Sequence, residues 1–255
     1  PSEDVTDELP VRTVDLPTFD MLKTEVTVAQ YGACVYAKWC SEPEKRGDGS
    51  WGVPGRDSHP MNYVSWSEAV SFCNWVQGRL PTESEWEYAA RNQGRDIYPW
   101  GDEQASCERA VMNNDAGSGC GTGGTMPVCS KTQGNTESGL CDMIGNLWEW
   151  TLDWYHDSYV GAPTDGSAWV DPRGATRTMR GGAFAYDAFW NRATARDSHG
   201  NPAFRVRTLG FRCVRGVEVE ADYDAPVIDT AAAGNFNNCG EEDCDFLCLA
   251  DACSN

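Results

Sequence analysis

Residues 78–91 read GRLPTESEWEYAAR, a stretch that contains a chain turn followed by the start of a helix. Thr82 and Glu85 form a Thr-x-x-Glu capping box, in which the hydroxyl and the carboxylate accept hydrogen bonds from free backbone amides of the first helical turn. The pattern predicts a helix that begins after Thr82, runs towards Arg91 and buries Trp86 on one side.

A second helix is predicted directly before this stretch. From Ser65, apolar residues recur at intervals of three and four and therefore share one helix face, at Trp66, Ala69, Val70, Cys73 and Val76. Gly78 ends this helix. Elsewhere the sequence offers a strand-prone stretch over residues 19–31, short strand candidates at residues 148–154, 178–184 and 209–214, and a long glycine-rich loop over residues 101–139.

The composition favours an irregular, loop-rich globular domain. The 255 residues include 20 Lys and Arg against 39 Asp and Glu, a net charge of −19, which disfavours binding to nucleic acid because phosphates require a basic surface. Eleven Trp, 9 Tyr and 8 Phe are too many aromatics for a disordered chain, while 26 Gly and 13 Pro are too many for a mostly helical one. The longest apolar runs are too short to span a membrane.

Twelve cysteines predict a disulfide-bridged protein in an oxidising compartment, so we expect it to be secreted, periplasmic or displayed on the cell surface. A zinc site is the alternative, but the sequence contains no Cys-x-x-Cys pair. The sequence begins at Pro1 without a charged and apolar leader, and we expect a signal segment to have been removed. A short bridge between Cys34 and Cys40 is expected. The four cysteines of the central loop region, Cys107, Cys120, Cys129 and Cys141, allow three connectivities.

Charge divides the chain into three expected parts: an N-terminal lead (residues 1–18), a main domain (residues 19–215) and an acidic, cysteine-rich C-terminal appendage (residues 216–255). The appendage contains no Lys or Arg. It is too small to fold on apolar burial alone, so two local disulfides are expected among Cys239, Cys244, Cys248 and Cys253. An acidic metal site is the alternative interpretation of this tail.

Several motifs follow one another in a specific order: EVT at residues 25–27, PMNYVSW at 60–66, the stretch at 78–91, YPWG at 98–101, GNLWEW at 145–150, RGG at 180–182 and GFRC at 210–213. From Phe19 to Arg215 this series resembles the formylglycine-generating enzyme family, also called the sulfatase-modifying factor family. The resemblance implies an irregular α/β fold related to C-type lectins, with little regular secondary structure. It also implies a disulfide between Cys73 and Cys213, which would close a very long loop.

The resemblance does not extend to the redox site. Members of the family bind copper(I) through two cysteines downstream of the Arg-Gly-Gly motif, because soft thiolates suit that ion. In this sequence Tyr186 and Asn191 stand at those two positions, and Ala183 replaces a serine that usually follows the glycines. A phenol and an amide do not replace thiolates for copper(I), so oxidation of a cysteine to formylglycine is not expected.

Iron-dependent relatives that make sulfoxides are a poor match as well. Their iron is held by histidines from an additional helical domain. This chain contains only His59, His156 and His199, which are widely separated. Each is more typical of a surface or hydrogen-bonded histidine than of a ligand.

Residues 141–149, CDMIGNLWE, resemble the family's calcium loop. Carried over residue by residue, the ligands would be the Asp142 side chain, the Gly145 and Leu147 carbonyls and the Glu149 side chain, a set of hard oxygen donors that suits Ca²⁺. Alternatively, Asp142 and Glu149 only cap turns. A second family calcium site does not align cleanly with Asn113, Asn114 and Asp115.

A ligand surface is the remaining site candidate. Polar and aromatic residues follow the Arg-Gly-Gly motif: Tyr186, Asp187, Phe189, Trp190, Asn191 and Arg192. Together they suit a groove that binds a glycan or a peptide. Equally, they suit a surface that packs inside the protein.

The sequence therefore favours a non-catalytic, calcium-stabilised binding or structural module outside the cytoplasm, whose partner is a protein, peptide or glycan. The first alternative is an oxidoreductase of the same superfamily with a non-standard, metal-dependent site for thiol or sulfur substrates. The second alternative is a surface-diversified ligand-binding protein of the same fold.

Overall fold

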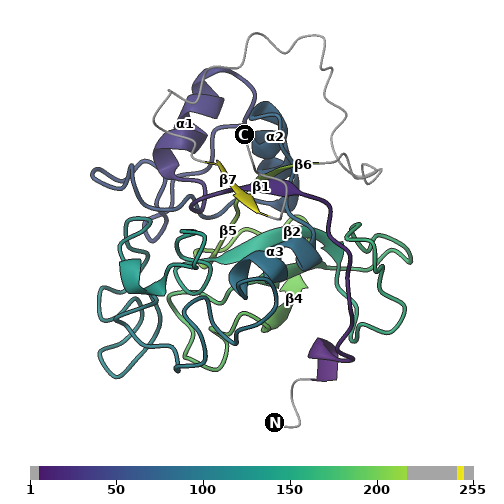
Figure 1. The fold of residues 1–255 in the computed structure, drawn as a ribbon. Coiled ribbons are helices and arrows are strands. Elements are labelled where there is room, and N and C mark those ends of the chain that lie inside the picture. Colours follow the sequence, from purple (N-terminus) through teal and green to yellow (C-terminus); the bar gives the residue numbers. More distant parts are fainter. Residues whose placement is uncertain (1–5, 217–245, 250–255) are drawn as a thin grey trace.

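The computed structural model describes residues 6–216 and 246–249, and loops make up most of that chain (Figure 1). Its helices are α1 (Val28–Tyr36), α2 (Trp66–Trp75) and α3 (Glu83–Ala90), with short 3₁₀ turns η1 (Thr6–Glu8) and η2 (Thr132–Gly134). Each α-helix begins at a complete capping box, with Thr27, Ser65 and Thr82 as the N-caps. The capping chemistry read from residues 78–91 therefore recurs at all three helix starts.

Two small sheets lie between the helices. The first has the strand order β4 (Arg196–Gly200), β3 (Arg177–Arg180), β2 (Trp148–Trp154) and β5 (Leu209–Gly210), with β2 and β5 parallel and the other pairs antiparallel. The second has β1 (Phe19–Leu22) in the middle, antiparallel to both β6 (Val214–Gly216) and β7 (Phe246–Leu249). The register of the first sheet places Glu149 opposite both Arg180 and Gly210.

The hydrophobic core is built around tryptophans. Trp66, Trp86, Trp148 and Trp150 are all fully buried, and α3 lies in front of β2 (Figure 1). The indole nitrogen of Trp66 donates to the Thr151 carbonyl at 2.8 Å, and that of Trp150 donates to the Val64 carbonyl at 3.0 Å. These bonds satisfy the polar edge of two large side chains inside the core.

Four disulfides join the eight cysteines of residues 6–216 in pairs. The expected bridges Cys34–Cys40 and Cys73–Cys213 both form, and the central loop is tied by Cys107–Cys120 and Cys129–Cys141. A chain with this many bridges belongs in an oxidising compartment. The two local disulfides expected in the C-terminal appendage lie outside the described residues.

Two of the strand expectations need correction, and one strand was not expected at all. The strand-prone stretch is a strand only at Phe19–Leu22, because Thr27 caps helix α1 and takes Val28 and Tyr31 into it. Residues 209–214 form two short strands that belong to different sheets, β5 and β6. Strand β4 was not expected, since its sequence RDSHG is polar and lacks β-branched residues.

Residues 6–18, the described part of the expected N-terminal lead, are hydrogen-bonded to the rest of the described chain. They run along the outside of the domain and reach η1 at the far end from β1 (Figure 1). Backbone hydrogen bonds join Asp15 to Thr164 at 2.8 Å and Tyr159 to Leu9 at 2.8 Å. Among the described residues, no helix has both the length and the apolar character needed to cross a bilayer.

Candidate functional site

The loop after β3, residues 181–192, carries Tyr186 and Asn191, the two residues that the sequence comparison expects at the redox positions; we call it the redox loop. It begins with Gly181 and Gly182, both at positive φ (99° and 72°). A Cβ on Gly182 would lie 2.3 Å from the Asn191 side-chain oxygen, so only glycine fits there. Asn191 is fully buried, and its Nδ2 donates to the carbonyls of Tyr186 at 2.8 Å and Asp187 at 2.7 Å. This amide holds the turn together.

Tyr186 is half-buried against the tryptophan of the GNLWEW motif. Its ring meets Trp148 edge-on, with the centroids 5.7 Å apart. Burial and, after it, the charge of Asp197 raise the pKa of the Tyr186 phenol above its usual value. The side chain is therefore a neutral phenol at physiological pH, which is not a ligand for copper(I).

Within residues 6–216 no free thiol is present, because the eight cysteines of this range are all in disulfides. One buried polar atom of the redox loop, Oδ1 of Asn191, has no hydrogen-bond partner. Unsatisfied buried polar atoms are uncommon in folded proteins and call for an explanation, such as a bound water or ion or a catalytic role.

The remaining ligand-surface candidates are on the outside of this loop. Asp187, Phe189 and Trp190 are exposed, and the Phe189 and Trp190 rings meet edge-on at 5.2 Å. Arg192 is partly buried, with its guanidinium 4.8 Å from the Phe189 ring centroid. The six candidates thus divide into an exposed aromatic and charged edge and an inner pair, Tyr186 and Asn191, that packs.

The calcium-loop candidates form a buried carboxylate cluster. Asp142 and Glu149 are both buried, and the structure adds a third buried carboxylate, Glu25, which accepts hydrogen bonds from Asn146 Nδ2 and Leu147 N, each at 3.0 Å. Burial and then the charges of Asp142 and Glu149 raise the pKa of Glu25 well above its usual value. Burial also raises the pKa of Asp142 to about 6. The cluster is short of positive charge.

Glu149 has a partner that the motif did not reveal. Arg212 of the GFRC motif donates to its carboxylate from Nε at 2.8 Å and from Nη2 at 2.7 Å, and Trp86 Nε1 donates at 2.9 Å. Both charged side chains are essentially inaccessible to solvent. Glu149 is therefore first of all one half of a buried, two-pronged ion pair.

The donor set fits a hard cation at Asp142 better than at Glu149. The loop turns through positive φ at Asp142 (53°), Gly145 (82°) and Asn146 (58°), and Cys129 N donates to Asp142 Oδ2 at 2.6 Å beside the Cys129–Cys141 bridge. A divalent cation would supply the positive charge that the buried carboxylates lack. At Glu149 the cation would have to share oxygens that already accept three hydrogen bonds.

Within residues 6–216 and 246–249, no three His, Cys, Asp or Glu side chains are placed to share a metal. His199 contacts Asp197 at 2.9 Å, His156 stacks on Trp169 at 3.6 Å and His59 contacts Thr125 at 3.0 Å, so the three histidines lie in separate environments.

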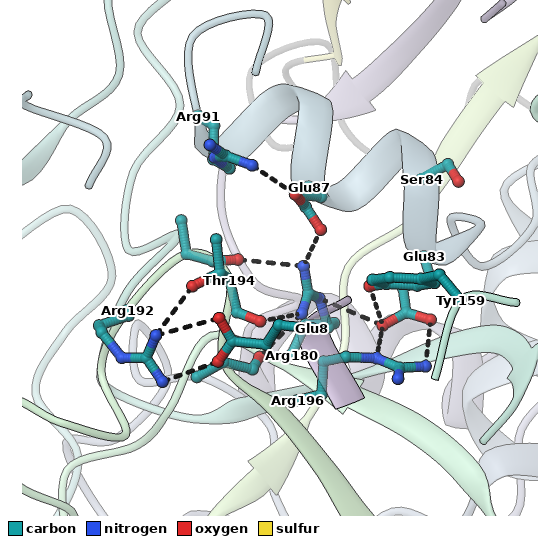
Figure 2. Close-up of polar contacts among 12 residues, drawn as sticks. Glu8, Glu83, Ser84, Glu87, Arg91, Tyr159, Arg180, Arg192, Thr194 and Arg196 are labelled. Carbon is teal, nitrogen blue, oxygen red and sulfur yellow. Dashed lines mark hydrogen bonds and ion pairs between the residues drawn. The ribbon is translucent and has the colours of Figure 1, made fainter. Parts of the chain in front are cut away.

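A second polar cluster, around α3, was missed at the sequence level. Glu83 pairs with Arg196 at 2.7 Å and lies 3.7 Å from Arg180, while Glu87 pairs with Arg180 at 2.6 Å (Figure 2). Burial alone would raise the pKa of Glu83, but the two arginines outweigh it and keep the pKa low. Glu83, Glu87 and Arg180 all belong to the quoted motifs, but the sequence did not reveal that they share one cluster.

These features define an irregular, disulfide-bridged α/β domain with a buried polar network. Residues 2–217 match the model of the sulfatase-modifying factor enzyme 1-like domain. The chain belongs to this family, and the expected fold class is confirmed.

Relatives include active and inactive proteins by their names. The chain is 37% identical over 185 residues to a formylglycine-generating enzyme of Streptomyces coelicolor, covering 66% of this chain and 56% of that enzyme. It is 32% identical over 180 residues to an inactive C-alpha-formylglycine-generating enzyme 2 of Bos taurus, covering 67% and 54%. The chain thus spans little more than half the length of either relative. The structure of PvdO from Pseudomonas aeruginosa superposes with a TM-score of 0.72 at 26% identity, covering 85% of this chain and 89% of that one.

Proposed function

We propose that this chain is a non-catalytic binding or structural module on the formylglycine-generating enzyme scaffold, stabilised by calcium and placed outside the cytoplasm. The observation that carries the proposal is the chemistry of the redox loop. Tyr186 is a neutral, half-buried phenol, and Asn191 is buried with its amide nitrogen bound to the loop's own carbonyls. Neither side chain supplies the soft ligand that copper(I) requires.

Copper binding tests this proposal. We expect the purified chain to bind no stoichiometric copper(I) or iron and to consume no oxygen with a thiol peptide. The double variant Tyr186→Cys, Asn191→Cys is expected to bind copper(I), whereas each single variant is not, because one thiolate does not form the site. Stoichiometric copper or iron in the natural chain, with oxygen consumption above the protein-free rate, would refute catalytic silence.

An oxidoreductase with a non-standard site is the second candidate. It is supported by the buried Asn191 Oδ1, which has no hydrogen-bond partner, and by the half-buried Tyr186 phenol beside Trp148. The same oxygen measurement separates the candidates, since an enzyme would lose its turnover in Tyr186→Phe while a binding module has none to lose.

Calcium binding is best tested at Asp142. Saturating Ca²⁺, at about 100 times its dissociation constant, adds about 2.7 kcal/mol to the free energy of unfolding, which for a domain of this size raises the melting temperature by roughly 5 to 10 °C. Asp142→Asn is expected to remove most of that rise. In the presence of a chelator the variant should be at least as stable as the natural chain, because it no longer buries a charge.

The matched control is Asp115→Asn, an exposed aspartate in the loop where a second family site does not align. It should keep the full calcium-dependent rise. Thermal unfolding followed by circular dichroism, with and without chelator, measures both variants. An undiminished rise in Asp142→Asn would remove Asp142 from the ligand set.

A further inference from the structure

The N-terminal turn η1 is bound to the domain through an ion pair at the edge of the redox loop. The Glu8 carboxylate accepts hydrogen bonds from Arg192 Nη2 at 2.7 Å and Nη1 at 3.1 Å (Figure 2). Neither side chain is freely exposed: 14% of Glu8 and 19% of Arg192 is accessible. A two-pronged contact of this kind is the usual way in which arginine binds a carboxylate ligand.

The neighbouring residues of the lead are held through their main chain. Arg196 Nη1 donates to the Asp7 carbonyl at 2.6 Å, and Tyr159 N donates to the Leu9 carbonyl at 2.8 Å. The Tyr155 hydroxyl donates to the Asp7 carboxylate at 3.0 Å. Donors from four residues of the domain therefore meet two carboxylates and two carbonyls of a single short segment, as in a peptide complex.

Apolar burial contributes little to this attachment. No residue of η1 is buried, and the next apolar side chains, Leu9 and Val11, are 51% and 90% exposed. The segment is thus held by charge and hydrogen bonds, not as part of the core. Because the segment is not part of the core, its replacement by another peptide with the same acidic groups would not require the core to open.

The domain itself carries a local excess of positive charge at this place. The arginines close to η1 are Arg180, Arg192 and Arg196, and the carboxylates of the domain that pair with them are Glu83 and Glu87 (Figure 2). Burial and then Glu83 raise the pKa of the nearby Asp153 to about 7, so this carboxyl is only partly ionised at neutral pH. Without Glu8, guanidinium groups outnumber carboxylates here, although the chain as a whole has a net charge of −19.

The same place continues into the exposed aromatic edge. Arg192 lies over Phe189, and Phe189 contacts Trp190. An aromatic pair beside an arginine offers both a carboxylate contact and a flat apolar contact, a combination enriched at protein interfaces.

We propose that Tyr155, Tyr159, Arg192 and Arg196 form a binding site for acidic peptide segments, which the chain's own Asp7 and Glu8 occupy as an internal ligand. We call these four residues the acidic-peptide cradle. The inference rests on the binding role proposed above and names its ligand class: a partner segment with a carboxylate in place of Glu8 and free main-chain carbonyls on either side. Partner and lead would compete for the cradle.

The test uses the full chain and a labelled peptide, TDELPVR, acetylated and amidated so that its termini carry no charge. In one variant the lead is replaced by Thr6→Gly, Asp7→Ser, Glu8→Gly and Leu9→Ser, which vacates the cradle. By fluorescence anisotropy, we expect this variant to bind the peptide at least about tenfold more tightly than the natural chain. Adding Arg192→Ala to the same variant is expected to weaken its peptide binding by a factor of about ten or more. The peptide TNQLPVR should bind poorly to every variant.

The single variant Glu8→Gln serves if the fourfold variant does not fold, and Glu108→Gln, at an exposed glutamate, should behave like the natural chain. Equal affinity of the natural chain and the lead variants would overturn the proposal. So would binding that survives Arg192→Ala, or a variant that only dimerises and binds no peptide. None of these outcomes depends on oxygen or copper. The copper-binding and oxygen measurements therefore test the proposed lack of catalysis independently of the peptide-binding proposal.

Discussion

Replacing Cys73 and Cys213 together by alanine is expected to lower the free energy of unfolding by about 4 to 5 kcal/mol. The bridge joins helix α2 to the segment between β5 and β6 and spans a sequence separation of 140. Its loss frees a very long loop in the unfolded chain, and the entropy of that loop is the physical reason for the size of the effect. Urea unfolding at equilibrium measures it.

The short bridge Cys34–Cys40 provides the matched control, because its cysteines are also buried but their sequence separation is only 6. The same alanine pair there is expected to cost about 2 kcal/mol. If both variants lost the same free energy, loop length would not determine the contribution of the long bridge.

Glu149→Ala is expected to cost about 3 to 5 kcal/mol, the usual result of leaving a buried charge without its partner. Arg212 would then lie fully buried with its main carboxylate partner gone. The converse change, Arg212→Met, should be comparably harmful, because it leaves the buried Glu149 carboxylate without its cationic partner. The double variant Glu149→Leu, Arg212→Met should lose less than the sum of the two.

These losses are expected with chelator present as well as with calcium, since they arise from the ion pair. A loss seen only in calcium would instead make Glu149 chiefly a metal ligand. The control is Glu44→Ala, which breaks the exposed pair with Arg46 and is expected to change stability by no more than about 1 kcal/mol. Chemical denaturation with and without chelator measures all of these variants.

The motifs that identify the family in this sequence are mostly packing residues. Glu85 caps α3 and accepts two hydrogen bonds from Arg79 at 2.7 Å. Trp86 donates to Glu149, which pairs with Arg212, so three separate motifs meet in one buried contact. Such residues preserve the fold whether or not the redox loop carries thiols, which is why the scaffold and its chemistry must be argued from different residues.

The same division explains which expectations held. Capping boxes and helical periodicity depend on residues within one turn of each other, so α2 and α3 were predictable from residues 65–91 alone. Strand β4 was missed and residues 19–31 were misjudged, because a strand depends on its neighbour in the sheet as much as on its own sequence. Helix α1 was also signalled locally, by Thr27 and Gln30, but the apolar residues around them concealed the cap.

By itself, the sequence determined the family, the local helix starts and the oxidising chemistry of the cysteines, since each depends on which residues are present and on short spacings. Only the tertiary structure decided which charges meet. It paired Glu149 with Arg212, brought Glu25 to Asn146 and Leu147, and brought Glu8 to Arg192 across 184 positions of sequence. Contacts between residues so far apart depend on how the sheets and loops pack, and no local pattern encodes that packing.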